Sequence, residues 1–230
     1  MEQEFAAIAS LLGEPARAIM LLKLLGGKAV PAGDLAFAAN VSPQTASGHL
    51  SKLVEGRIVS FEQRGRHRYY RLADEDVASA VESMLALMPG HRRGIQPKAA
   101  PAVGTLPYAR TCYSHLAGWL GVQINDALQA KGLLEPCGDM TFAVTEAGRA
   151  WFEDMGVTVL RSTGRQPAKF ARPCNDWTER RPHLAGTLGV SLYRRMMELG
   201  WITAIPGTRA VRVTSRGKQE LSKRLGLRLG

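Results

Sequence analysis

Short apolar runs with helical spacing dominate the start of the chain. Residues 6–12 (AAIASLL) and 19–25 (IMLLKLL) are strongly apolar, and each is followed by glycine, which favours the end of a helix. A run of small and apolar residues then opens at Pro31. We therefore expect two helices packed into a core, and a third helix that begins at Pro31.

A fourth helix is predicted by a capping signal. Ser42 followed by Pro43 has the form of an N-cap with proline at the first helical position, where the missing N–H costs nothing. Leu50, Leu53 and Val54 mark the buried stripe of this segment. The pattern indicates a helix from Pro43 to about Glu55.

The first turns of this helix carry short polar side chains, and a basic hairpin follows. Short polar groups can approach base edges and phosphates in a major groove without a clash. Two strand-like runs, 58–62 and 68–72, are joined by residues 63–67 (QRGRH), which predicts a β-hairpin with a cationic tip. Each part alone is also typical of a solvated helix face or a soluble loop. In this order, the parts favour DNA binding.

Composition narrows the class of protein and of partner. The 230 residues are 45% hydrophobic and 22% charged, which suits one large or two small globular domains. The net charge of +10 favours an anionic partner, either nucleic acid or an acidic membrane surface. No stretch approaches the roughly 20 apolar residues of a membrane span, and Glu2 and Glu4 stand where a signal peptide would be basic. We expect a cytoplasmic protein with no membrane partner.

Residues 42–50 (SPQTASGHL) and 65–72 (GRHRYYRL) resemble the arsenic-repressor (ArsR) family of winged-helix regulators, over residues 1–88. The resemblance implies a homodimer formed by the first helix and the helix after the wing, 74–88, with two recognition helices on an inverted-repeat operator. It also implies repression that a bound signal relieves. The family's common metal sites cannot be carried over, because residues 1–111 contain no cysteine and residues 74–88 no histidine.

The helix, the hairpin and the resemblance together predict a set of DNA contacts. The residues expected to make them are Ser42, Gln44, Thr45, Ser47, His49, Lys52, Arg64, Arg66, His67 and Arg68.

The second half of the chain repeats itself. Residues 109–122 (ARTCYSHLAGWLGV) return as ARPC at 171–174 and HLAGTLGV at 183–190, and His115 and His183 are 68 positions apart. Each copy predicts a helix from the HLAG segment, a second amphipathic helix, an extended segment and a helix capped by threonine. This order is winged-helix-like. Because the second helices lack a Ser/Thr-rich opening, we expect a sensing domain rather than further DNA readers.

The predicted fold is mainly α with small β-hairpin wings, in the α+β class. A winged helix-turn-helix DNA-binding and dimerisation domain spans residues 1–88. A linker rich in proline, glycine and small residues spans 89–107. A duplicated sensing domain spans 108–230, with repeats at about 108–156 and 170–226.

The repeated motifs offer candidate metal ligands at Cys112, His115, Cys174 and His183. Sulfur and imidazole are ligands that zinc prefers. The spacing is uneven, since two residues separate the first pair and eight the second. The alternatives are thiol redox sensing, because Arg110 and Arg172 precede the cysteines, and packing of the four side chains in a core.

A small-molecule pocket is the favoured sensor. Tryptophans near the repeated motifs supply broad apolar faces, and nearby polar groups could orient a ligand. The residues in question are Trp119, Asp176, Trp177, Arg180, His183 and Trp201.

The function predicted from the sequence is a sequence-specific transcriptional regulator. We expect a homodimeric repressor of double-stranded DNA, released by a small molecule or by a metal or redox signal. The alternatives are an architectural DNA-binding protein without sequence preference and an enzyme fused to a winged helix. Residues 107–230 show no glycine-rich phosphate loop, paired carboxylates or nucleophile elbow, so we expect no enzyme.

Overall fold

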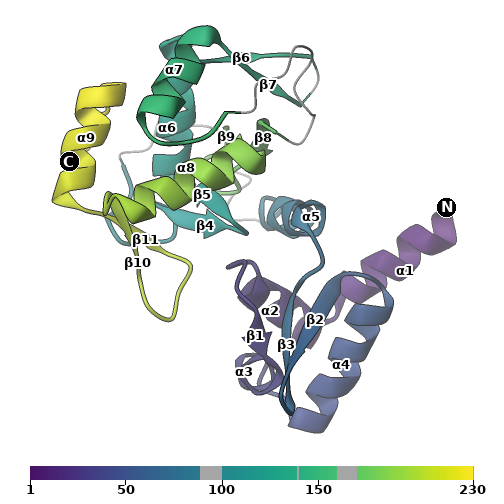
Figure 1. Cartoon of the computed structure of the whole chain (residues 1–230). Coiled ribbons are helices and arrows are strands. Elements are labelled where there is room, and N and C mark those ends of the chain that lie inside the picture. Colours follow the sequence, from purple (N-terminus) through teal and green to yellow (C-terminus); the bar gives the residue numbers. More distant parts are fainter. Residues whose placement is uncertain (89–99, 139, 160–169, 230) are drawn as a thin grey trace. The chain divides into compact units, whose positions relative to one another are not determined.

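The computed structural model describes residues 1–88, 100–138, 140–159 and 170–229. Within these ranges the chain forms two compact units, Met1–Val81 and Glu82–Gly230, which are described separately (Figure 1). Of the predicted linker at 89–107, residues 89–99 lie outside the described residues.

The first unit is a helical core with a three-stranded sheet. Its elements are α1 (Glu2–Gly13), α2 (Pro15–Leu24), β1 (Val30–Pro31), α3 (Ala32–Ala38), α4 (Pro43–Glu55), β2 (Val59–Arg64), β3 (His67–Leu72) and the beginning of α5 (Glu75–Leu85). The sheet is antiparallel in the order β1-β3-β2, and Arg64 pairs with His67. The predicted hairpin is confirmed, but its turn is only Gly65 and Arg66, because the strands include Gln63, Arg64 and His67 of the predicted connection.

Apolar faces of α2, α3 and α4 form the core of this unit. Met20, Leu35, Leu50 and Leu53 are each fully enclosed. The expectation that the first helix is packed into this core is wrong, because α1 has no buried residue. Phe5 and Ile8 are exposed, whereas Leu11 and Leu12 at the end of the helix are half-buried.

The second unit contains both copies of the repeat, in the same order of hairpin, helix, hairpin and helix. The first copy has β4 (Arg110–Cys112), β5 (His115–Ala117), α6 (Gly118–Ala130), β6 (Leu134–Pro136), β7 (Phe142–Val144) and α7 (Glu146–Asp154). The second copy has β8 (Arg172–Asn175), β9 (Pro182–Ala185), α8 (Gly186–Glu198), β10 (Ile202–Ala204), β11 (Val211–Val213) and α9 (Ser215–Leu225).

The HLAG segments are strands, which corrects the prediction of helices there. Each is the second strand of a hairpin, and a single helix follows directly. Gly118 and Gly186 make the sharp junction, with φ of 82° and 77°, a region that other residues rarely adopt. All three residues of β5 are buried, so no polar alternation distinguishes the strand from a helix.

The two copies exchange contacts, so neither forms a separate core. Helix α6 packs on β9 of the other copy, and α8 packs on β5. The N–H of Phe142 in β7 donates to Ala171, and the N–H of Val211 in β11 donates to Ala109, at 2.9 and 2.8 Å. The reciprocal pattern gives the unit an approximate internal twofold symmetry.

The threonine caps predicted for the last helix of each copy are confirmed. The Thr145 hydroxyl accepts from Gly148 N and donates to Gly132 O, at 2.9 and 2.7 Å. Thr214 makes the equivalent bonds at 3.0 and 2.7 Å. Each cap therefore also joins its helix to the end of the preceding one.

A buried network of charges crosses between the copies. Arg110 of β4 and Asp176, in the loop between β8 and β9, are 0% and 1% exposed and lie 2.9 Å apart. Glu82, at the end of α5, lies 3.6 Å from Arg110 and pairs with Arg209 at 2.6 Å. Asp176 also accepts from the N–H of Gly118 at 2.7 Å.

This network determines the charge of Asp176. Burial disfavours the carboxylate, but Arg110, His183 and the hydrogen bonds from Thr178 and Gly118 hold the pKa of Asp176 well below its usual value. The side chain is therefore an anion that compensates a buried guanidinium.

No single helix of the described ranges is both long enough and apolar enough to cross a membrane. The pair α1 and α2, bent by 79° relative to each other, meets that criterion only when the two are taken together, by length and composition.

Replacing Asp176 with asparagine should destabilise the second unit. The change keeps the shape of the side chain but removes the charge nearest to Arg110, so we expect the free energy of unfolding to fall by about 3 kcal/mol. The matched control is Asp126→Asn, because Asp126 pairs with Arg181 at 2.5 Å near the surface, where loss of a pair costs less than about 1 kcal/mol. Urea denaturation of both variants provides the measurement. Equal, small losses would contradict the role of the network.

Candidate DNA interface and buried cysteine and histidine cluster

Helix α4 presents a polar face that begins at its N-terminus. Ser42 caps the helix by accepting from Thr45 N at 3.1 Å. Ala46, Leu50 and Leu53 face the core, which leaves the opposite face to solvent. The predicted contact residues that are exposed there are Ser42, Gln44, Thr45, Ser47 and Lys52.

Two predicted contacts on this helix already have partners within the protein. The Thr45 hydroxyl lies 2.8 Å from that of Ser42 and so belongs to the cap. His49 is half-buried, and its Nδ1 lies 3.4 Å from a carboxylate oxygen of Glu14, the N-cap of α2. The His49 side chain therefore connects α4 to α2. Gln44 and Ser47, near the start of α4, are the remaining exposed polar side chains.

The β2–β3 hairpin carries the cationic tip that the sequence predicts. Arg64, Arg66, His67 and Arg68 are all exposed. Arg64 pairs with Glu62 and lies over Tyr69. Arg66 is at the turn, where its Nε donates to His67 at 3.4 Å.

Arg68 lies over an aromatic ring at the base of the wing. Its guanidinium carbon is 4.9 Å from the centre of the Phe61 ring, and Phe61 in turn packs against Tyr70. The stacked rings restrict the Arg68 side chain, so Arg66 is the cation that projects from the tip with least restraint.

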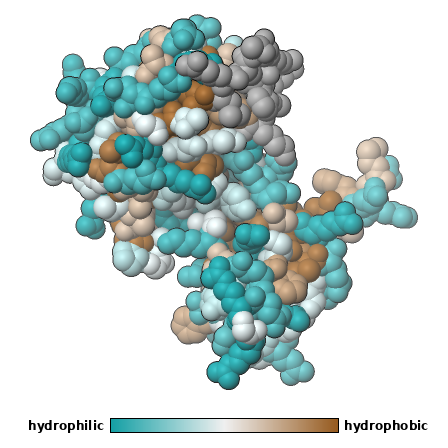
Figure 2. Space-filling view, viewed as in Figure 1, coloured by the Kyte–Doolittle hydropathy of each residue, from teal (hydrophilic) through white to brown (hydrophobic). Residues whose placement is uncertain are grey.

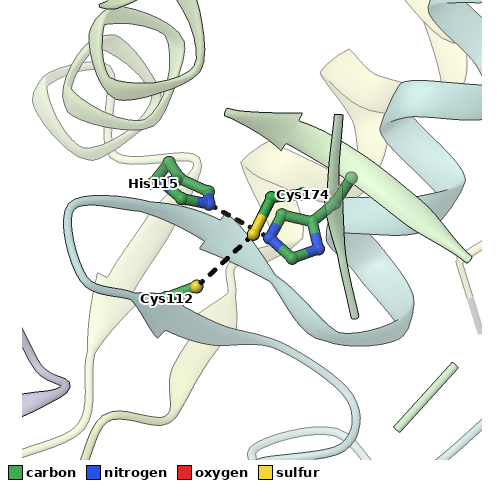
Figure 3. A group of neighbouring side chains, drawn as sticks. Cys112, His115 and Cys174 are labelled. Carbon is green, nitrogen blue, oxygen red and sulfur yellow. Dashed lines mark hydrogen bonds between the residues drawn. The ribbon is translucent and has the colours of Figure 1, made fainter. Parts of the chain in front are cut away.

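The four candidate metal ligands of the second unit come together in one buried group. We refer to Cys112, His115, Cys174 and His183 as the Cys/His cluster. Their ligand atoms all lie within 4.8 Å of one another. The two sulfurs are 3.9 Å apart and the two Nε2 atoms 3.1 Å apart. Figure 3 shows Cys112, His115 and Cys174 pointing toward one another.

Strand register explains how the cluster forms. Cys112 is directly opposite His115 in the first hairpin, and Cys174 is directly opposite His183 in the second. Residues paired across antiparallel strands project from the same face. Each copy therefore contributes one cysteine and one histidine. The uneven sequence spacing reflects only a longer turn in the second hairpin.

The cysteines influence each other's ionisation. The contact with Cys174, together with burial, raises the pKa of the Cys112 thiol. The contact with Cys112 and the two histidines lower the pKa of Cys174. The groups that lower the pKa of Cys174 are thus other members of the cluster, and not the Arg172 named beside it in the redox hypothesis.

The other predicted sensor residues are distributed over several environments. Asp176 lies beside the cluster, 3.5 Å from His183 Nδ1, and Trp177 lies over the Arg110 guanidinium. Trp201 is part of the apolar core and Trp119 packs against it. Arg180 is exposed. Of these residues, Asp176 lies beside the Cys/His cluster, and Trp201 and Trp119 lie in or against the apolar core.

Sequence reasoning missed the roles of Glu82 and Arg110. Glu82 looks like an ordinary polar residue of an amphipathic helix, yet it is 1% exposed and faces two arginines. One feature of the sequence could have indicated the pair. Asp176 lies in the longer turn of the second hairpin and has no counterpart in the first copy, so a charged partner for it elsewhere in the chain could be expected.

Comparisons with known proteins found one full-length relative and several solved structures that cover part of the chain. No family model matches the sequence. The chain is 44% identical over 229 residues, covering 100% of both chains, to a protein of Bacillus subtilis (strain 168) named "Uncharacterized HTH-type transcriptional regulator YdfF". NolR from Sinorhizobium fredii is a similar solved structure, with 25% identity over 36% of this chain and 82% of NolR and a TM-score of 0.33.

A second solved structure is the homodimeric winged helix-turn-helix DNA-binding domain of Mb0332 from Mycobacterium bovis, a possible ArsR-family transcriptional regulator. It is 29% identical over 36% of this chain and 76% of its own, with a TM-score of 0.33. The assignment of this chain to a family rests on the full-length relative from Bacillus subtilis. That assignment agrees with the capped helix and basic hairpin described above. The chain belongs to the family of HTH-type transcriptional regulators.

Proposed function

We propose that the protein is a sequence-specific, homodimeric repressor that binds an inverted-repeat operator. The observation that carries the proposal is the exposed polar opening of α4 beside a hairpin with a cationic tip. An α-helix fits the major groove, where side chains such as Gln44 and Ser47 can reach base edges. The wing would neutralise phosphates without reading sequence.

Helix α1 supports the proposal of a dimer. In a single chain, Phe5 is 74% exposed and Ile8 is 46% exposed. Figure 2 shows apolar surface along α1. A helix of 12 residues with no buried side chain has little reason to be stable alone in water. A second copy of α1 would bury these side chains, in agreement with the dimer that the family resemblance implies.

The second unit is the proposed receiver of the signal. Its buried network extends from Asp176 through Arg110 to Glu82, the side chain at the end of α5. A ligand acts only if it favours one arrangement of the protein over another, so an inducer would have to change the contacts of this network. A small organic molecule remains the predicted inducer.

The named relative is a regulator, which is in line with the prediction that the chain is not an enzyme. That prediction itself remains to be tested. The competing proposal within DNA-binding proteins is an architectural role, and the ratio of affinities for an operator and a scrambled duplex separates the two. A regulator should favour its operator by roughly a thousandfold or more.

Base readout is tested by replacing Gln44, Thr45 or Ser47 with alanine. We expect each change that removes a base contact to reduce the free-energy difference between operator and scrambled duplex by on the order of 1 kcal/mol. Fluorescence anisotropy titrations measure both affinities. Glu55→Gln, at the far end of α4, is the control and should leave the ratio unchanged. Unchanged specificity in all three variants would exclude α4 as the reading helix.

The wing is tested by comparing Arg66→Ala with Arg64→Ala. Because Arg66 projects from the turn, its loss should weaken binding to all duplexes alike and reduce the slope of log affinity against log salt by about 1. Arg64 is already paired with Glu62, so we expect a smaller change. Affinities measured over a range of salt concentrations give both slopes. If Arg66→Ala keeps the slope of the parent protein, the wing does not contact the backbone.

The dimer is tested with Phe5→Glu. A charge on the exposed apolar side of α1 should convert the proposed dimer to a monomer, because burying it unpaired is unfavourable. Light scattering coupled to size-exclusion chromatography measures the mass. Phe37→Glu is the control, since Phe37 is 89% exposed on α3, outside the proposed interface. A Phe5→Glu protein of unchanged dimeric mass would contradict this interface.

A further inference from the structure

Two separations within the Cys/His cluster are close to those of a tetrahedral metal site. With zinc bonds of about 2.3 Å to sulfur and 2.05 Å to nitrogen, a tetrahedron places two sulfurs about 3.8 Å apart and two nitrogens about 3.3 Å apart. The observed separations are 3.9 Å between the sulfurs and 3.1 Å between the Nε2 atoms. A disulfide would instead require the sulfurs to be about 2.05 Å apart.

The surroundings of His183 are those of a metal ligand. Its Nε2 faces the cluster, while its Nδ1 lies 3.5 Å from a carboxylate oxygen of Asp176. Carboxylates commonly hold the second ring nitrogen of metal-binding histidines, and so orient the ring toward the metal. Asp176 is itself held by Arg110 and by the N–H of Gly118.

Charge balance favours a divalent cation. The four side chains of the cluster are between 0% and 4% exposed, so an unpaired charge among them would be costly. Two thiolates, two neutral imidazoles and one divalent cation sum to zero. The adjacent charges of Arg110 and Asp176 already compensate each other. The negative charge of two thiolates would therefore have to be balanced by the metal ion.

The cluster is assembled from two equal halves. Each hairpin supplies one cysteine and one histidine, and the helix of each copy packs against the histidine of the other. A Cβ built on Gly121 would lie 3.5 Å from the Cβ of His183, and one built on Gly189 would lie 3.6 Å from that of His115. An ion at the centre would therefore connect the two copies across their approximate twofold axis.

We propose that the Cys/His cluster binds one Zn²⁺ ion in a closed, four-ligand site that joins the two copies of the repeat. The enclosure leaves no open position for a substrate, so the role of the ion is structural. Zinc suits two thiolates and two imidazoles in tetrahedral geometry better than the oxygen-preferring cations do. The inference does not rest on DNA binding, and its failure would leave the proposed regulator function untouched.

The first experiment measures metal in the full-length protein. Mass spectrometry of the purified protein should find about one zinc per chain. After removal of zinc with a chelator under reducing conditions, the melting temperature should fall, and added Zn²⁺ should restore it. Replacement by Co²⁺ should give the visible absorption bands of tetrahedral cobalt bound to sulfur. A protein that contains no zinc, takes none up under reducing conditions and gives no such cobalt spectrum would overturn the proposal.

The second experiment assigns the ligands. Cys112→Ser and Cys174→Ser should each abolish the sulfur-to-cobalt absorption of a four-ligand site or greatly weaken zinc retention against a competing chelator. Cys137→Ser is the matched control, because Cys137 lies outside the cluster and should keep both properties. Retention of zinc and of the full cobalt spectrum by both cluster variants would overturn the assignment. The wild-type measurements stand even if a cluster variant fails to fold.

Discussion

The buried ion pair between Arg110 and Asp176 is the interaction on which the second unit depends. The two side chains come from different copies of the repeat, and both are almost fully enclosed. Loss of either one would be costly, because a buried charge that loses its nearest partner costs several kcal/mol. The same carboxylate accepts from Gly118, where a strand turns sharply into α6, and lies beside His183. One group therefore links the hairpin junction, the copy interface and the Cys/His cluster.

Duplication explains why the cluster has two cysteines and two histidines. Register pairs each cysteine with a histidine in its own hairpin, and the exchange of contacts between copies brings the two pairs together. The copies are not equivalent, however, because the longer turn of the second hairpin carries Asp176. The symmetric part of the unit thus supplies the four side chains of the cluster. The asymmetric part supplies Asp176, which lies beside His183 and pairs with Arg110.

In the first unit, the placement of the proposed DNA-reading side chains depends on the two faces of α4, one apolar and one polar. Ala46, Leu50 and Leu53 are buried, so the polar first turn can only face solvent. His49 is drawn toward Glu14 and helps to hold α4 in place. The side chains proposed to read DNA are therefore placed by a rigid helix rather than by a loop, which suits recognition of a fixed pattern of base edges.

Local signals in the sequence determined the winged helix, the caps and the duplication. The N-cap at Ser42, the turn at Gly65 and the capping threonines depend on neighbouring residues only, so they could be predicted without the rest of the chain. The HLAG strands could not, because a short segment buried on all sides has no polar alternation to distinguish it from a helix. Only the tertiary structure decided that Cys112 and Cys174 meet and that Arg110 is paired with Asp176, since strand register and the crossing of the two copies depend on contacts between residues more than 60 positions apart.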